Sequence, residues 1–251
     1  MLEVSGLTKR FGGFTAVKDV GFTLRKGEIL GLIGPNGSGK STTFNLIAGT
    51  LQPSAGQILF NGREIGGLSP AAVCHQGIAR TFQIPRPFRK LSIVENVVVA
   101  AYYGHGREID RKQAQDYALE ALELVQLPTD GGAKVDALGA AGLKKLELAR
   151  ALATRPSLLL ADESLGGLDE VEIEQAADSL IRIRDEKDIT IIWVEHIMGV
   201  LMRVVDRCIV LDHGEKIAEG LPREIAHDPR VVEVYLGQDA TTVQDQVTDR
   251  G

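Results

Sequence analysis

The sequence predicts an α/β fold with a mainly parallel sheet, a small antiparallel β subdomain and an inserted helical subdomain. Three observations predict it. A short apolar run at 28–33 leads into a glycine-rich loop and then a helix-like segment that ends at Gly49. From about residue 143, helix-like and strand-like segments alternate, which is typical of a parallel sheet covered on both faces. The first 62 residues instead contain strand-like runs joined by turns.

The predicted antiparallel layer rests on three runs near the N-terminus. Residues 2–4 and 20–24 are strand-like, and the turn-rich segment 9–13 lies between them. A third run, at 56–62, ends in Asn61-Gly62, a dipeptide that favours a tight hairpin turn. We therefore expect a small β layer beside the strand at 28–33.

The glycine-rich loop is the most informative motif. Residues 34–41 read GPNGSGKS and fit the pattern G-x-x-x-x-G-K-[ST]. A strand, glycine loop and helix in this order point backbone N–H groups and a helix N-terminus at an anion. Lys40 is expected to reach the β- and γ-phosphates of a nucleotide, and the Ser41 hydroxyl to hold Mg²⁺. The predicted nucleotide contacts are Gly34, Asn36, Gly37, Gly39, Lys40, Ser41 and Thr42.

The middle of the chain changes character from about Leu91. Residues 93–97 and 111–125 have helical periodicity, and 128–132 break it. We expect a helical subdomain over about 85–150, inserted into a domain that spans 1–237. The remaining residues, 238–251, are polar and lack periodicity, so we expect a disordered tail.

Two further strand-like runs end in residues that suit phosphate chemistry. The run at 157–162 ends in Asp162 and Glu163, and the run at 189–194 is followed by Glu195 and His196. Ligands of open parallel sheets bind beyond the carboxyl ends of the strands. Asp162 is then placed to hold Mg²⁺ directly or through water, Glu163 to polarise the attacking water, and His196 to contact the γ-phosphate. The alternatives are a surface loop for Asp162-Glu163 and a buried structural histidine for His196.

Composition limits the remaining possibilities. The net charge of −6 argues against a nucleic-acid-binding face as the main function. No apolar run approaches the roughly 18 residues that span a bilayer, and the N-terminus shows no signal peptide. Cys74 and Cys208 lie far apart and are expected to act as small buried hydrophobic residues.

An ordered set of motifs resembles the nucleotide-binding subunit of an ABC transporter over residues 2–237. The set is Phe11, the loop at 34–42, Gln83, LELARAL at 146–152, LLLADE at 158–163, Leu168-Asp169 and His196. The segments FGGFTAV, GIARTFQ, IAEGLPREI and VVEVYLG look closest to the ATP-binding proteins of branched-chain amino acid importers. The resemblance implies a P-loop NTPase fold and an ATPase that uses ATP and Mg²⁺. It also implies that Phe11 stacks on adenine, although a core role in the small lobe is an alternative.

The resemblance assigns further roles to two loops and reveals one departure. Gln83 would sense Mg²⁺ and water and link to membrane subunits, and Asp169 would lie in a loop that crosses between two nucleotide-binding subunits. The family signature L-S-G-G-Q stands here as Leu-Gly-Ala-Ala-Gly at 138–142. Gly139 lacks the serine hydroxyl and Ala141 adds a methyl group where backbone should approach phosphate, while the helix N-terminus remains. Either the composite site is weak, or these small residues suffice; the residues concerned are Gly139, Ala140, Ala141 and Gly142.

The function that we expect from the sequence is ATP-driven uptake of branched-chain amino acids or related small solutes, at the cytoplasmic face of the cell membrane. The expected partners are a second ATPase subunit, identical or different, two membrane permease subunits and, indirectly, a substrate-binding protein, with no nucleic acid. Alternatives are a lipid or lipopolysaccharide export ATPase and a nucleotide-gated subunit that hydrolyses ATP weakly. The apolar residues after Gln83 suggest a docking patch for the membrane subunits, unless Phe88 and Leu91 fill the core; the patch comprises Ile84, Pro85, Pro87, Phe88 and Leu91.

Overall fold

The computed structural model describes residues 1–106, 108–162, 168–195 and 198–235. Its central sheet has the order β10-β9-β3-β8-β7-β6. All neighbours in this sheet are parallel except β10 with β9. The strands are β3 (Ile29–Ile33), β6 (Ile78–Arg80), β7 (Leu158–Asp162), β8 (Thr190–Val194), β9 (Arg207–Asp212) and β10 (Glu215–Gly220). The predicted mainly parallel sheet is confirmed.

A second, antiparallel sheet lies beside the first, with the order β2-β1-β4-β5. Its strands are β1 (Leu2–Phe11), β2 (Phe14–Leu24), β4 (Ala55–Phe60) and β5 (Arg63–Glu64). Asn61 and Gly62 both have positive φ, as the tight turn between β4 and β5 requires. The predicted antiparallel layer is confirmed, and the turn expected within 9–13 is present but confined to Gly12 and Gly13. Strand pairing continues through Lys9 to Phe11, and register shifts along β1 hide the two-residue alternation in the sequence.

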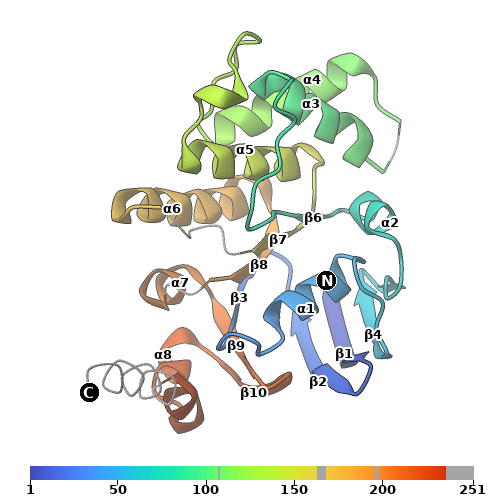
Figure 1. Cartoon of the computed structure of the whole chain (residues 1–251), viewed down its shortest axis with the longest axis vertical. Coiled ribbons are helices and arrows are strands. Elements are labelled where there is room, and N and C mark those ends of the chain that lie inside the picture. The colour runs from blue at the N-terminus through green and yellow to red at the C-terminus, as the bar shows by residue number, and fades with distance from the viewer. Residues whose placement is uncertain (107, 163–167, 196–197, 236–251) are drawn as a thin grey trace, which may run out of the picture.

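The helices cover both faces of the central sheet (Figure 1). They are α1 (Lys40–Ile47), α2 (Pro70–His75), α3 (Ile93–Gly104), α4 (Arg111–Leu124), the 3₁₀ turn η1 (Val135–Ala137), α5 (Ala140–Ala153), α6 (Glu170–Lys187), α7 (Met198–Val204) and α8 (Pro222–Ile225). Helices α3, α4 and α5 pack on one another and form a helical lobe. The buried alanines Ala114, Ala118 and Ala121 let α4 approach its neighbours closely, because they are small.

The two faces of the central sheet bury two separate hydrophobic cores. In β7, Leu158 and Leu160 belong to the core shared with the antiparallel sheet and α1, whereas Leu159 and Ala161 belong to the core under the helical lobe. Successive side chains of a strand point to opposite faces, so a continuous apolar run is what a sheet covered on both sides requires. This rigid sheet fixes where the strand ends lie.

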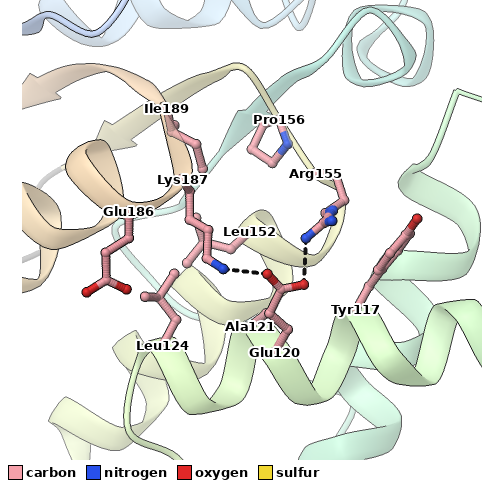
Figure 2. Close-up of a pocket in the computed structure, with 10 residues that line it drawn as sticks. All are labelled: Tyr117, Glu120, Ala121, Leu124, Leu152, Arg155, Pro156, Glu186, Lys187 and Ile189. Carbon is pink, nitrogen blue, oxygen red and sulfur yellow. Dashed lines mark hydrogen bonds and ion pairs between the residues drawn. The ribbon is translucent and has the colours of Figure 1, made fainter.

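Glu120 joins the helical lobe to the sheet domain. Its carboxylate, on α4, accepts a hydrogen bond from Arg155 Nη1 at 2.5 Å and another from Lys187 Nζ at the end of α6. Figure 2 shows both cations pointing at Glu120. The three residues line a cavity of about 380 Å³, and the Arg155 guanidinium lies 4.5 Å from the centre of the Tyr117 ring. The pKa of Glu120 is lowered, mainly by the hydrogen bond from Lys187, although partial burial opposes the shift.

We expect Glu120→Gln to lower the free energy of unfolding by up to about 1 kcal/mol at neutral pH, because both ion pairs are partly exposed. A carboxylate with a lowered pKa in the folded protein stabilises it above the pKa of the unfolded chain. That contribution disappears as the pH falls through the folded pKa. Urea denaturation of both proteins between pH 7 and pH 3 measures the difference, which should vanish at the acid end. Glu123→Gln, on the exposed side of α4, is the matched control. Equal midpoints for Glu120→Gln and wild type at pH 7 would contradict the assignment.

Candidate nucleotide-binding site

The glycine-rich loop connects β3 to α1 in a backbone conformation that needs glycine at two points. Gly34 has φ of 147°, and a Cβ atom there would lie 2.1 Å from the carbonyl oxygen of Leu211. Gly39 has φ of 103°, and its Cβ would lie 2.7 Å from the carbonyl oxygen of Ala16. Both positions have left-handed φ and no room for a side chain, so the loop shape depends on these residues.

Lys40 folds back over this loop. Its Nζ donates hydrogen bonds of 2.8 Å to the carbonyl oxygens of Gly34 and Pro35, and the residue is only 5% exposed. A cavity of about 250 Å³ lies against the loop, lined by Phe14, Ala16 and residues 36–42. Asn36, Gly37, Ser41 and Thr42 all contribute to this lining, and their contacts with phosphate stay predictions. A helix N-terminus beside a cavity favours a bound anion.

The aromatic residue that lines this cavity is Phe14, which was not among the residues predicted from the sequence. Phe11 and Phe14 face each other across the β1–β2 hairpin, and their side chains are 46% and 65% exposed. Phe11 is therefore not a core residue, and that alternative is wrong. Its proposed contact with adenine stays a prediction. Phe14 could have been predicted from the sequence, because a two-residue turn at 12–13 places residues 11 and 14 opposite each other in a hairpin.

Asp162 lies at the carboxyl end of β7 and is 6% exposed. Its Oδ2 accepts a hydrogen bond of 2.6 Å from Arg80 Nη2, and its backbone N–H donates to Thr81 Oγ1 at 3.2 Å. Arg80 also donates to Asn45 Oδ1 on α1 at 2.6 Å. The strand ends of β6 and β7 are thus tied to the helix that follows the phosphate loop. Carboxylate and hydroxyl oxygens, as on Asp162 and Ser41, form the hard donor set that Mg²⁺ prefers.

The sheet order brings the predicted chemistry to one edge. Strands β3, β8, β7 and β6 are neighbours. The phosphate loop and Glu195 follow β3 and β8, and Asp162 and Arg80 are the last residues of β7 and β6. Gln83, which is exposed, lies three residues beyond the end of β6. Glu163 and His196 lie outside the described residues, so their roles stay predictions. Short β6 and its Arg80 were not predicted, because three residues give too little periodicity.

The altered signature forms the start of α5. Gly139 is its N-cap, with φ of −72° and ψ of −174°, and no side chain caps the helix. Ala140, Ala141 and Gly142 follow as the first turn, so their N–H groups lack partners within the helix. Asp169 instead makes a capping box with Glu172, accepting from its N–H at 2.8 Å and donating its own N–H at 3.0 Å. Asp169 therefore has a structural role at the start of α6, whatever it contacts in an assembly.

The apolar segment after Gln83 lies largely at the surface. Ile84 is 69% exposed and Phe88 is 47% exposed, whereas Leu91 is half-buried. Asn96 fixes the backbone of Phe88, since its Oδ1 accepts from the Phe88 N–H at 2.7 Å and its Nδ2 donates to the Phe88 carbonyl at 3.0 Å. The Phe88 ring packs 5.2 Å from the Arg150 guanidinium. The alternative that Phe88 fills the core is wrong. Within the described ranges, no helix is long and apolar enough to cross a membrane.

Comparisons with known proteins agree with this geometry. Residues 17–166 match the family model described as ABC transporter, and residues 215–241 match that of the branched-chain amino acid ATP-binding cassette transporter. The chain is 34% identical to the high-affinity branched-chain amino acid transport ATP-binding protein BraF of Pseudomonas aeruginosa, covering 95% of this chain and 98% of that protein. An ATP-binding cassette of an ABC transporter in its ADP conformation superimposes with a TM-score of 0.85 and 29% identity, over 94% of this chain and 98% of the other. A dimeric bacterial ABC transporter cassette gives 0.79 and 27%, over 89% and 99%.

Proposed function

The chain belongs to the ABC transporter family of ATP-binding cassettes, and from that premise we propose that its ATPase activity powers the uptake of branched-chain amino acids or related small solutes. The observation that carries the proposal is the phosphate loop at the same sheet edge as the buried carboxylate Asp162. The substrate class is supported by BraF and by the second family match at 215–241.

The proposed reaction is in-line attack of water on the γ-phosphate, which breaks the bond to the β-phosphate oxygen and releases ADP and phosphate. The N–H groups of the loop and Lys40 would bind the phosphates, while Ser41 and Asp162 would hold Mg²⁺. When bound, Mg²⁺ would neutralise charge on the phosphate oxygens. Glu163 would orient the attacking water, with His196 and Gln83 near the γ-phosphate and Phe11 on the adenine. These roles are assigned from the sequence motifs in which the residues stand.

We further propose that the chain works as a dimer at the cytoplasmic face of a membrane, with two permease subunits and, indirectly, a substrate-binding protein. The dimeric cassette among the structural neighbours supports a second ATPase subunit as partner. In such a dimer the first turn of α5 would offer its N–H groups to the nucleotide of the other subunit, with Asp169 nearby. A helix N-terminus suits this task through its dipole.

Weak hydrolysis is the second candidate, because Gly139 and Ala141 replace residues of the usual signature. We expect Gly139→Ser combined with Ala141→Gly to raise ATP turnover of the assembled transporter. A side chain fits at Gly139, since no atom lies within 4 Å of the position that a Cβ atom would take there, and serine is a good N-cap. Gly131→Ser, also in open space in the helical lobe, is the matched control. A fall or no change in turnover would show that the present residues are adequate.

The exposed apolar segment after Gln83 is proposed to receive the membrane subunits. We expect Phe88→Asp to leave ATP binding intact and to abolish co-purification with the permeases, because a buried carboxylate is costly at an apolar contact. The isolated variant should fold, since Phe88 is half exposed and the new carboxylate would lie beside Arg150. Tyr103→Asp, at an aromatic residue that is 73% exposed at the end of α3, is the control. Normal assembly of the Phe88 variant, or its failure to fold, would place the docking surface elsewhere.

Uptake of labelled leucine, isoleucine and valine tests the proposed substrate class directly. Proteoliposomes that contain this chain with its membrane subunits should accumulate at least one of these amino acids when ATP is supplied. Lys40→Ala in the same assembly should abolish uptake. ATP-driven transport of other solutes without these three would contradict the substrate class while leaving the ATPase role intact.

A further inference from the structure

Arg80 occupies the junction between three parts of the nucleotide site. It ends β6, and its guanidinium donates to Asp162 at the end of β7 and to Asn45 on α1, both at 2.6 Å. The flat group packs against aromatic rings, with its centre 5.9 Å from Phe44 and 5.2 Å from Phe82. The Arg80 side chain is only 12% exposed, so its orientation is fixed by these contacts.

The charge of Asp162 explains why a cation is needed at this place. A buried carboxylate without a partner is strongly unfavourable, and breaking a buried ion pair from one side leaves such a charge. The hydrogen bond from Arg80 is made to Oδ2. We assign the other carboxylate oxygen, Oδ1, to a metal ion or its water. In the metal-free protein, Arg80 therefore neutralises the charge of Asp162, as a bound metal ion would do in part.

The positive charge of Arg80 also opposes the binding of a second cation at Asp162. Mg²⁺ at Asp162 would lie close to the guanidinium, and like charges in a partly buried site repel strongly. The phosphates of a nucleotide carry several negative charges and would offset this repulsion. Metal binding at Asp162 should then depend on the nucleotide.

We propose that Arg80 is a built-in counter-cation for Asp162, which holds the carboxylate ready in the metal-free protein and restricts Mg²⁺ binding to the nucleotide-bound state. The proposal rests on the proposed function, because it takes Asp162 as the metal carboxylate. Arg80 is a positioning residue here, since it acts on the metal through Asp162. Arg80 also contacts the segment that carries Gln83, because the ring of the preceding residue, Phe82, packs on its guanidinium.

Thermal unfolding of the nucleotide-free protein, with EDTA or with millimolar MgCl₂, tests the proposal. Arg80→Gln removes the charge but keeps a side-chain donor, so it should melt lower than wild type in EDTA. Mg²⁺ alone should then raise its melting temperature by about 3 °C or more. Wild type and the charge-retaining Arg80→Lys should shift by less than about 1 °C. Adding Asp162→Asn to Arg80→Gln should cancel the Mg²⁺ response, because no carboxylate is left to pair.

Arg150→Gln is the matched control for loss of a buried arginine. Arg150 pairs with Glu147 at 2.8 Å and packs on Phe88, as Arg80 does with Asp162 and Phe82. This variant should lose stability without gaining a response to Mg²⁺. If wild type is stabilised by ATP with Mg²⁺ but Arg80→Gln responds to Mg²⁺ alone no more than wild type does, the inference is wrong and the proposed function stands. If ATP with Mg²⁺ does not stabilise wild type, the proposed function itself fails and the inference falls with it.

Discussion

Replacing Lys40 by alanine is expected to weaken ATP binding by at least about a hundredfold, since hydrogen bonds to charged groups contribute about 1.5–3 kcal/mol each. The lysine acts twice. Its Nζ holds the loop closed through the carbonyl oxygens of Gly34 and Pro35, and the same charge is placed for the β- and γ-phosphates. Alanine removes both interactions and leaves the loop without its internal donor. Titration of the purified protein with a fluorescent ATP analogue measures the loss.

Lys26→Ala separates this effect from a general loss of positive charge. Lys26 lies before β3, at the opposite end of the strand from the phosphate loop, and makes an exposed ion pair with Asp188. Its removal should leave ATP affinity unchanged, because an exposed ion pair contributes little. Circular dichroism should show that both variants are folded. A Lys40 variant that is folded and binds ATP as tightly as wild type would disprove the assignment.

The parts of the site that could be predicted are those encoded within a few neighbouring residues. The loop at 34–41 and the strand end at Asp162 each combine an apolar run with a local motif, and the structure places both at one sheet edge. The sequence of neighbouring residues is enough to predict these parts, because the strand, the loop and the helix are consecutive in the chain. The helix expected from about Leu143 begins earlier, at Ala140 within the altered signature, because this first turn carries too little apolar periodicity to reveal it.

Contacts between distant segments could not be predicted. Arg80 and Asp162 lie 82 positions apart, and their pairing depends on the parallel register of β6 with β7. The same holds for Glu120, whose partners Arg155 and Lys187 come from two other elements. Cys74 is half-buried rather than buried, because it lies in the short helix α2. A single sequence carries no signal for such pairings, since each residue type is ordinary in its own segment.

Glu163→Gln is expected to lower ATP turnover by about 10²–10⁴, the contribution of a positioned general base. Glu163 directly follows Asp162, whose buried carboxylate marks the end of β7 at the sheet edge that carries the phosphate loop. Glutamine has nearly the shape of glutamate and can still hydrogen-bond to water, but it cannot accept the proton that leaves the attacking water. Phosphate release from the assembled transporter measures the change.

Measuring ATP affinity shows whether Glu163→Gln loses turnover in the chemical step or through weaker ATP binding. The residues expected to hold the nucleotide are in the loop at 34–42, so Glu163→Gln should bind ATP as tightly as wild type, in contrast to Lys40→Ala. Glu123→Gln, an exposed glutamate on α4, controls for the loss of one negative charge and should turn over ATP normally. Turnover within a factor of about three of wild type for Glu163→Gln would correspond to well under 1 kcal/mol in the barrier and would exclude Glu163 as the base. A parallel loss of ATP binding would instead assign Glu163 to the architecture of the nucleotide site, because a base that acts only on the attacking water contributes to the transition state and not to the bound ground state.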